Sequence, residues 1–292
     1  MTYPNGRRLD YGYGVANGID DHLSRLQSIG EDEETLVDYH FAGLARYVRI
    51  VYPEPGVELS YLTASDAPDG GSGDPYGGYD RFGRVQQMRW IKTATGEIVD
   101  GWQWGFDRAS NRTWRKNLVT TSGQDEAYGY DGLYQVIRDA VGTLNTNRTA
   151  IGGTPNVEEG FSYDPVGNWL GYRKYEDGET VLDQTRGSNR DNQLVQIDGS
   201  SSLLEYDKIG NALKVPPGVG EDWDKCFQPV WDAWNRLVRV KDESGATVQK
   251  NAYDGLFRRI TKESGGAVAH TYWSSRWKPL EERTGSETTA AR

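Results

Sequence analysis

One seven-residue pattern recurs along this chain and constrains its fold more than any other feature. The pattern opens with an aromatic residue and Asp, has an apolar residue in the fourth place and has Arg, Asn or Gln in the sixth. Seven copies fit it, beginning at Tyr79, Phe106, Tyr130, Tyr163, Tyr206, Trp231 and Tyr253. The composition predicts on the order of 0.2 chance matches to such a pattern in the whole chain. The chain is therefore built from repeats.

The first two places of the pattern suit the end of a strand and the start of a turn. The aromatic residue ends an incoming strand and would stack on its counterpart in the neighbouring unit. The Asp that follows it can accept backbone N–H groups two residues further on, as in an Asx-type turn. The structural Asp residues predicted in this way are Asp80, Asp107, Asp131, Asp164, Asp207, Asp232 and Asp254.

The fifth place suits a turn residue with positive φ. Five copies have a residue there that tolerates this conformation, namely Gly83, Ser110, Gly167, Gly210 and Asn235. Tyr134 and Phe257 take this place in the other two copies. We therefore expect the turns at Tyr134 and Phe257 to differ from the rest or to be strained.

The segments around each turn predict β-hairpins. An alternating strand leaves the turn, as in Leu237-Val238-Arg239-Val240, and a Gly-containing tract such as 263–266 reverses the chain again. With 18 Tyr, 10 Trp and 36 Gly, the composition favours many short strands joined by tight turns. Because a single hairpin is marginal in water, we expect the hairpins to form one continuous, curved or spiral antiparallel sheet in an all-β fold. One short helix is compatible with the apolar spacing in 19–29.

The repeat region is expected to span residues 1–283. The clear copies lie in 79–266, and a degenerate copy around 189–195 fills the 43 residues that separate Tyr163 from Tyr206. Weaker copies are expected in 1–78, one of them with His40 in the place of Asp, and 53–78 is expected to be a long inserted loop. The polar tail 284–292 is expected to be flexible, and unpaired strand edges are expected at both ends of the region.

Charge and hydropathy exclude several classes of partner. The net charge is −10 and the isoelectric point about 4.9, so a phosphate backbone would repel the chain and no nucleic acid is expected to bind. No apolar run approaches the roughly 18 residues of a membrane span, and the first residues lack a signal peptide. Cys226 is the single cysteine, so no intrachain disulfide is possible. Nothing in the sequence indicates a cofactor, a metal site or a catalytic residue.

The repeat pattern, at this spacing, resembles the YD repeats of RHS proteins, which are related to teneurins and to the B and C components of insecticidal toxin complexes. The resemblance runs from Tyr3 to Glu282 and is plainest from Trp231 to Gly266. It implies a β-sheet wound into a hollow shell that encloses a C-terminal toxin or effector domain. It also implies a bacterial protein that is secreted or displayed on the cell surface. The implied partners are the conserved core and the effector domain of the same polypeptide.

Two other functions compete with that of a shell wall. A carbohydrate-binding or adhesion surface, with cell-surface glycans as the partner, would use exposed indole rings. The candidate residues are Trp102, Trp104, Trp114, Trp169, Trp273 and Trp277. Three or more coplanar, exposed Trp side chains on one face would favour this reading over packing within the wall. A glycosidase with paired carboxylates is the third reading, but turn chemistry explains an Asp repeated seven times better.

Overall fold

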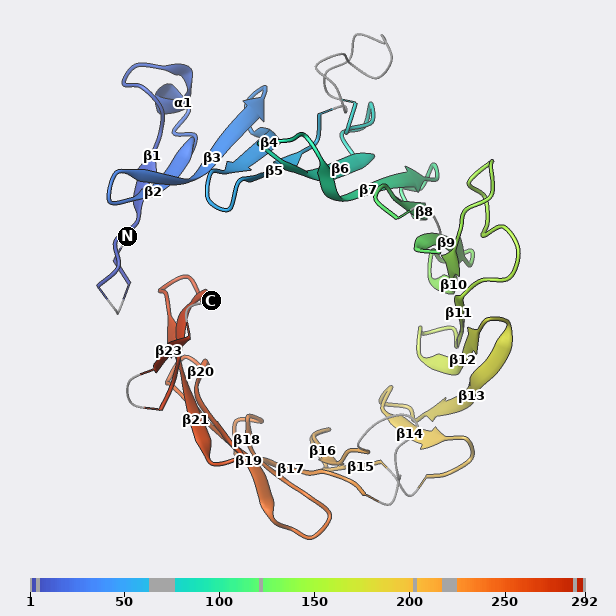
Figure 1. Cartoon of the computed structure of the whole chain (residues 1–292). Helices are drawn as coiled ribbons and strands as arrows, with labels where there is room; N and C mark the ends of the chain where they lie inside the picture. The colour runs from blue at the N-terminus through green and yellow to red at the C-terminus, as the bar shows by residue number, and fades with distance from the viewer. Residues whose placement is uncertain are drawn as a thin grey trace. The chain divides into compact units, whose positions relative to one another are not determined.

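The computed structural model describes residues 2–3, 6–62, 77–120, 123–201, 204–216, 225–285 and 288–290. Strands dominate these residues, and helix is confined to α1, Ile19–His22. The strands follow one another in chain order (Figure 1). Their bounds are β1 Asp10–Gly12, β2 Ser28–Glu31, β3 Glu34–Ala42, β4 Arg46–Tyr52, β5 Val57–Ser60, β6 Gln87–Lys92, β7 Ile98–Phe106, β8 Arg112–Asn117, β9 Asp125–Tyr130, β10 Val136–Gly142, β11 Val157–Tyr163, β12 Trp169–Glu176, β13 Glu179–Ser188, β14 Leu194–Ile197, β15 Glu205–Tyr206, β16 Ala212–Lys214, β17 Gln228–Trp231, β18 Leu237–Lys241, β19 Thr247–Tyr253, β20 Arg259–Ser264, β21 Ala267–Trp273, β22 Pro279–Thr284 and β23 Thr288–Ala290.

Sheets of 14, 2 and 7 strands make up this fold, and within each sheet the strand order is the sequence order. The prediction of an all-β chain of tandem hairpins is therefore confirmed. One sheet ends at β14 and the next begins at β15, whereas β16 and β17 belong to different sheets but are joined by an isolated antiparallel bridge between Val215 and Phe227. The connections at these two places include 202–203 and 217–224, which lie outside the described residues.

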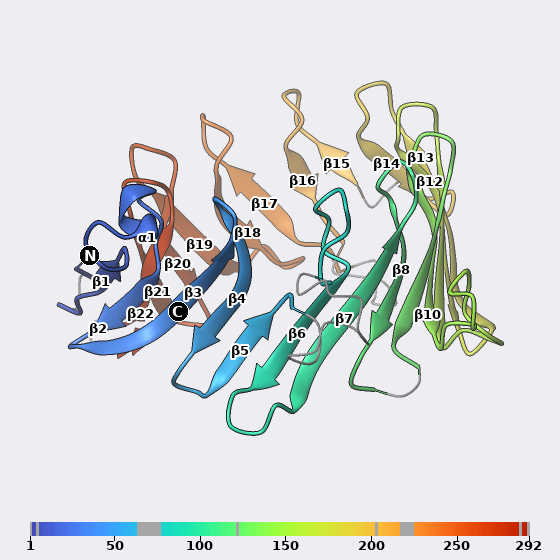
Figure 2. The same cartoon turned by 90° about the horizontal axis from the view of Figure 1, so that it is seen from above.

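The chain divides into two compact units. The first comprises 8–162 and 173–183. There, β1 to β11 pair antiparallel with their sequence neighbours, and long strands such as β3 and β7 lie among them (Figure 2). The second comprises 163–172 and 184–292, with a short N-terminal piece, 2–7. It contains the hairpin of β15 and β16 and the seven-stranded sheet from β17 to β23.

One expectation about an irregular segment was wrong. The stretch 53–78 was expected to be a loop, but it contains β5, whose residues pair with both β4 and β6. The Pro- and Gly-rich surroundings hide the short alternation of Val57 and Leu59; the rest of this prediction, at 63–76, lies outside the described residues. In the polar tail β23 pairs with β22, and the flexibility of the tail as a whole stays a prediction. Backbone pairing requires no apolar side chain, so the polar composition did not exclude a strand.

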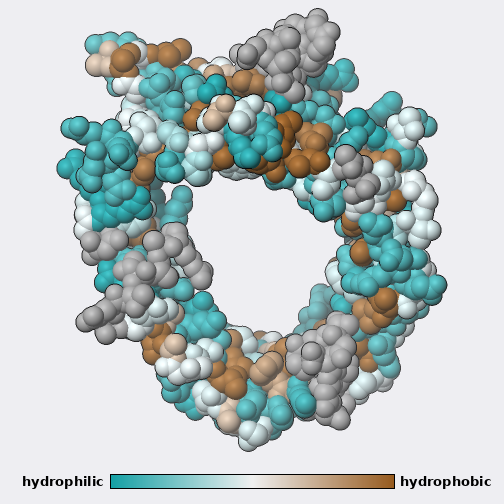
Figure 3. Space-filling model, viewed as in Figure 1, coloured by the Kyte–Doolittle hydropathy of each residue, from teal (hydrophilic) through white to brown (hydrophobic). Residues whose placement is uncertain are grey.

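Little of the packing resembles a deep apolar core. Ala127, Ala140 and Ile151 form a small buried cluster, with Leu144 packed against it. Polar side chains such as Gln184 and Glu281 are as buried as the apolar ones. On the face drawn in Figure 3, hydrophobic and hydrophilic residues alternate in small areas. Stability must therefore come largely from strand pairing and from the side chains that join the turns. Among the described residues, no helix is long and apolar enough to cross a bilayer.

Candidate functional site

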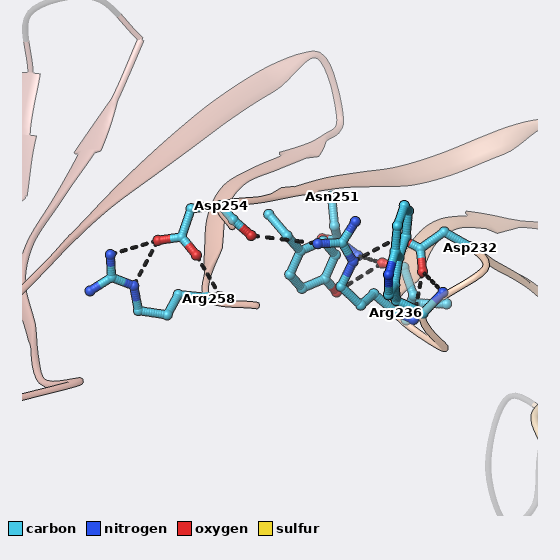
Figure 4. A network of polar contacts seen from close by, with 8 residues as sticks. Asp232, Arg236, Asn251, Asp254 and Arg258 are labelled. Carbon is cyan, nitrogen blue, oxygen red and sulfur yellow. Dashed lines mark hydrogen bonds and ion pairs between the residues drawn. The ribbon is translucent and has the colours of Figure 1, made fainter. Parts of the chain in front are cut away.

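The Asp of each repeat lies in its own turn and accepts two backbone N–H groups. In the turn after β19, one carboxylate oxygen of Asp254 accepts from Leu256 N at 2.9 Å and from Arg258 N at 3.0 Å (Figure 4). The same two bonds, at 2.8 to 3.0 Å, occur at Asp80, Asp131, Asp164, Asp207 and Asp232. Each turn is thus closed by a side chain that the sequence supplies at a fixed place.

The residue in the sixth place of the pattern completes the turn and reaches the next one. Its side chain donates to the second carboxylate oxygen, at 2.7 Å from Arg258 Nε to Asp254 and at 2.8 Å from Asn211 Nδ2 to Asp207. The same Arg258 donates through Nη1 to the carbonyl of Ser274, which opens the following turn, at 3.1 Å. Corresponding contacts between successive turns join Arg84 to Asp107, Arg236 to Asp254, Asn168 to Asn192 and Asn211 to Asn235.

The aromatic residue of each repeat forms a second link between neighbouring units. Tyr130 donates its hydroxyl to the carbonyl of Arg112, which lies directly after the preceding turn, and Tyr253 donates to Leu237 in the same way. Equivalent bonds are made by Tyr79 and Tyr206, and the indole N–H groups of Trp231 and Trp273 make them in place of a hydroxyl. These contacts replace the ring-on-ring stacking expected from the sequence. We call the repeated Asp, sixth-place and aromatic contacts the turn ladder.

Electrostatics favour the ionised form of the turn carboxylates. Desolvation acts to raise the pKa of Asp254, but hydrogen bonds from the Arg258 side chain and from two backbone N–H groups outweigh it and hold the pKa below its usual value. Asp232 beside Arg236 has a lowered pKa for the same reasons (Figure 4). In the first unit the side chain of Asp80 is only 7 % exposed, and its pKa is lowered by the bonds from Arg84 and Phe82 despite desolvation. The turn ladder therefore depends on charged carboxylates.

The fifth residue of the turn has positive φ whatever its side chain. Gly83 and Gly167 do so at no steric cost, with φ of 79° and 91°. Tyr134 and Phe257 adopt the same conformation, at 63° and 66°, and Trp277 does so at 62°. These turns were expected either to differ from the others or to be strained. They have the same conformation as the others, so the strain falls on the side chains at the fifth place.

Two further copies of the turn occur that lack Asp. Asn189 accepts from the backbone N–H groups of Asp191 and Gln193, in the degenerate copy predicted there. Ser274 accepts from Lys278 N, a copy that the sequence pattern missed because Ser replaces Asp. The aromatic Trp273 before it was the available signal.

His40 was expected to stand in the Asp place of a turn, but this was wrong, because it lies within β3 opposite Arg49. The repeat copy that precedes Tyr79 opens two residues later than expected. Tyr79 donates to the carbonyl of Tyr47 and lies under the guanidinium of Arg46, at 4.7 Å from the ring centre. Arg46 thus takes the sixth place of a copy that opens at Phe41.

All six candidate carbohydrate-contact tryptophans lie under arginine or are held by the backbone. In the first unit Arg115 covers Trp102 at 4.1 Å, Arg112 covers Trp104 at 5.4 Å and Arg148 covers Trp114 at 4.8 Å. Trp273 binds the backbone of the preceding strand.

Arg186 lies over Trp169 at 4.7 Å and Arg258 over Trp277 at 5.9 Å, and these two rings are still exposed by 38 % and 54 %. The exposed tryptophans among the described residues are Trp169, Trp277 and Trp234, the last of which was not a candidate, and glycan binding stays a prediction. A small cavity of about 170 Å³ beside Trp114 is lined by Gln87, Gln103 and Arg148. Two of its amides are already bonded to each other, at 2.7 Å.

One carboxylate of the sheet differs from those of the turns. Asp139 on β10 lies in register with Tyr128 on β9 and with Glu159 on β11. Burial, followed by the charges of Glu126 and Glu159, raises its pKa to about 6, against the opposing effect of Arg115. Its Oδ1 atom is buried and makes no hydrogen bond. This carboxylate has a raised pKa and lies on a face of the sheet, away from the turns.

The turn carboxylates do not converge on one place. Each of the seven Asp side chains is bonded within its own turn, so no pair of them is set at either side of a substrate as a glycosidase requires. The arrangement can hold neighbouring hairpins together, and the absence of catalysis stays a prediction.

Solved structures share the fold of the whole chain. A chain of the Photorhabdus luminescens Tc holotoxin pore with a mutant TccC3 component matches with a TM-score of 0.66 and 15 % identity over 97 % of this chain. A chain of the TcdB2–TccC3–Cdc42 complex matches with a TM-score of 0.65, 15 % identity and the same coverage. A TcdB2–TccC3 structure matches with a TM-score of 0.52, 14 % identity and 96 % coverage.

These neighbours are RHS-repeat shell components of Tc toxins. This chain has the RHS-repeat fold. It spans only 14 % of the length of each of those solved chains. No family model matches the sequence, and no curated protein matches it. The RHS relationship therefore rests on the repeat pattern together with the fold.

Proposed function

We propose that this chain is a section of the wall of an RHS-repeat shell, which encloses a toxin or effector domain carried by the same polypeptide. The turn ladder is the observation that carries the proposal. It joins neighbouring hairpins by side-chain bonds to the backbone, as between Arg258 and Ser274, Tyr206 and Leu194, and Trp231 and Ala212. A wall needs this continuity, whereas a binding module needs a pocket.

The fold comparison supports the same role at a coarser level, because the solved chains of the same fold are Tc toxin shell components. Secretion or display at the cell surface follows from this role. The role also implies that this section of the polypeptide is structural and not an enzyme. The remaining partners would be other segments of the same polypeptide.

Protease protection in the full-length polypeptide tests the proposal. If the repeats form the wall of a closed compartment, the enclosed domain should resist a protease that digests it rapidly when it is expressed alone. Replacing Asp80 by Ala should open the wall and make the enclosed domain at least tenfold more sensitive, because the turn loses the acceptor of its backbone N–H groups.

Val248→Ser is the matched control, because Val248 is exposed on a strand and takes no part in the turn ladder. It should leave protection unchanged. Equal digestion of the enclosed and the free domain in the unmodified polypeptide would refute the role of a wall.

A further inference from the structure

The cavity of about 170 Å³ in the first unit takes no part in the turn ladder. Gln87 on β6 lies opposite Gln103 on β7, so these two lining side chains share one face of the sheet. Trp114 on β8 lies opposite Gly105, two residues beyond Gln103, and therefore faces the same way. The cavity thus lies on one face of three neighbouring strands.

The Trp114 ring can border the cavity because position 105 has no side chain. A Cβ atom on Gly105 would lie 1.9 Å from Nε1 of Trp114. The ring therefore lies against the backbone of β7, where any other residue would push it away. Gly105 is within a strand, so the close approach of the ring, and not a turn, requires the glycine.

Arg148 reaches the cavity on a loop that folds back over the same face. The loop 143–156 joins β10 to β11, and its Ile151 belongs to a buried cluster with Ala127 of β9. Ala127 lies opposite Trp114, so the loop passes beside that ring. The guanidinium carbon of Arg148 lies 4.8 Å from the centre of the Trp114 ring, and both residues line the cavity.

The loop and the ring hold Arg148 in one position. The carbonyl of Asn145 accepts from Arg148 N at 2.9 Å, and its side-chain oxygen accepts from Thr149 N at 3.0 Å. Attraction between the guanidinium and the Trp114 ring fixes the other end of the side chain. A side chain that is already ordered loses less entropy when it binds a ligand.

Arg148 differs from the arginines of the turn ladder. Arg84 and Arg258 each bond an Asp and a backbone carbonyl. Within the part of the chain that the structure describes, no oxygen accepts a hydrogen bond from the exposed Arg148 side chain. The other residues that line the cavity are uncharged, so the cavity has one positive charge in a chain whose net charge is −10. This charge favours an anion.

The two amides offer one further donor and one acceptor. Gln103 donates Nε2 to Oε1 of Gln87 at 2.7 Å, which leaves Nε2 of Gln87 to donate and Oε1 of Gln103 to accept. A guanidinium and a neighbouring amide N–H match the oxygens of a carboxylate, and the remaining Oε1 matches a hydroxyl or N–H of the same ligand. A single cation suits the one charge of a carboxylate better than the two charges of a phosphate.

We propose that this cavity binds a small carboxylate-bearing molecule that also has a hydroxyl or an amide N–H group. Arg148 and Gln87 bind the carboxylate, Gln103 accepts from the hydroxyl or N–H, and Trp114 positions Arg148. The cavity is smaller than the roughly 300 Å³ at which pockets for drug-sized ligands begin, so it suits a hydroxy acid or an acylated amino acid. This inference is independent of the enclosure proposed above.

Titration of the intact chain, followed by the NMR signal of the Trp114 indole N–H, gives the first test. N-acetylglycine should shift this signal and saturate it, with a dissociation constant below about 10 mM. N-acetylglycinamide has the same shape without the charge and should bind at least tenfold more weakly. Glycolate distinguishes the source of the carboxylate, because tighter binding than N-acetylglycine would assign the ligand to the hydroxy acids.

Arg148→Gln removes the cation and should raise the dissociation constant for N-acetylglycine at least tenfold. Arg148 is exposed on a loop, so the thermal midpoint should not change. Arg190→Gln is the matched control, since it removes the same charge from another exposed arginine; it should leave the dissociation constant within about twofold. The proposal is overturned if the amide binds as tightly as the acid, if Arg148→Gln binds as the unmodified chain does, or if the Trp114 signal does not shift.

Discussion

In the seven-stranded sheet, the connections at one end of the strands differ from those at the other end. We call these two rows of strand ends the edges of the sheet. The turns 232–236, 254–258 and 274–278 lie at one end of the strands, which we call the turn edge. Each has five residues and an Asp or Ser at its start, and Arg236 and Arg258 bond to the turn that follows theirs. At the other edge the connections vary in length. Asp242 closes a turn there with the same two backbone bonds, but Ala246 in the sixth place has no side chain that could reach a neighbour.

This contrast explains why the sequence shows a repeated pattern for the turns at one edge and none for the connections at the other. A turn that is bonded to its neighbours must keep its length and its polar residues, because any change breaks contacts in two successive repeats. A turn that stands alone needs only to reverse the chain. In the first unit the other edge accordingly ranges from the two residues Asp32 and Glu33 to the long connection between β10 and β11.

Acid should have the largest effect on stability. The turn carboxylates and Asp139 on a strand should respond to pH with opposite sign. The turn Asp residues have lowered pKa values in the folded state, so their stabilisation is complete above about pH 4 and is lost as the pH falls through those values. Asp139 has the opposite sign. Its folded pKa of about 6 exceeds the ordinary 3.8, so its contribution is favourable at low pH and is lost as the pH rises through 6.

Thermal unfolding measured from about pH 3 to about pH 8 checks both signs. The midpoint should fall steeply below about pH 4, and the Asp139 contribution should make it decline slightly as the pH rises from about 4 to about 6, with no further decline above that. Asp139→Asn should abolish only the second change. An unchanged decline in that variant would show that another group causes it.

Removing a turn carboxylate should be the most damaging single substitution. Asp80→Ala leaves two backbone N–H groups and Nε of Arg84 without their acceptor, and should lower the free energy of unfolding by about 2 kcal/mol. Asp242→Ala at the other edge loses a turn but no ion pair, and should have a smaller effect. Urea unfolding of both variants measures the difference. Equal losses would mean that the link between turns adds nothing.

Arg258→Lys tests the link itself while keeping the charge. Lysine cannot bond Asp254 and the Ser274 carbonyl together, so the free energy of unfolding should fall by about 1 kcal/mol. Lys250→Ala removes an exposed ion pair with Glu263 on neighbouring strands, and should change it by less than about 0.5 kcal/mol. The comparison requires only chemical denaturation of the two variants. A larger effect at Lys250 would contradict the importance given to the turn edge.

The smallest expected effect of these substitutions is a gain in stability. Tyr134→Gly relieves the positive φ of an exposed side chain, and the free energy of unfolding should rise by about 0.5 kcal/mol, after the entropy that glycine adds to the unfolded chain. Gln135→Asn should add to it, because Gln135 Oε1 is buried without a partner, whereas Asn168 in the same place bonds Asp164. Calorimetry of the single and double variants measures both. A loss on Tyr134→Gly would show that the Tyr134 ring is held by contacts.

The sequence predicts those parts of the fold in which one residue has one local task. The hairpins, the Asp-closed turns and the degenerate copy at Asn189 belong to this class, because their bonds lie within five residues. The sixth-place Arg and Asn were visible as a constraint, but their second bond joins residues about 20 positions apart, such as Arg84 and Asp107. Local chemistry cannot indicate such a partner.

Other features were misread for related reasons. The turn at Ser274 was missed because a hydroxyl accepts the bond that a carboxylate accepts elsewhere. The frame at His40 was wrong by two residues, because Phe41 and Tyr39 both fit the aromatic place. The exposure of the candidate tryptophans depends on which arginine lies above each ring, as at Arg115 and Trp102, and on long-range register.

The succession of strands in chain order affects how the protein would respond to force. Each strand of the seven-stranded sheet pairs only with the strands before and after it in sequence. A pull on one end therefore separates a single outer strand along its hydrogen bonds, while the others stay paired. The sheet should unzip hairpin by hairpin in many small steps, and each released hairpin closes only a short loop when it pairs again. A chain built in this way could be drawn out through a narrow opening and could refold on the far side in the order in which it emerged.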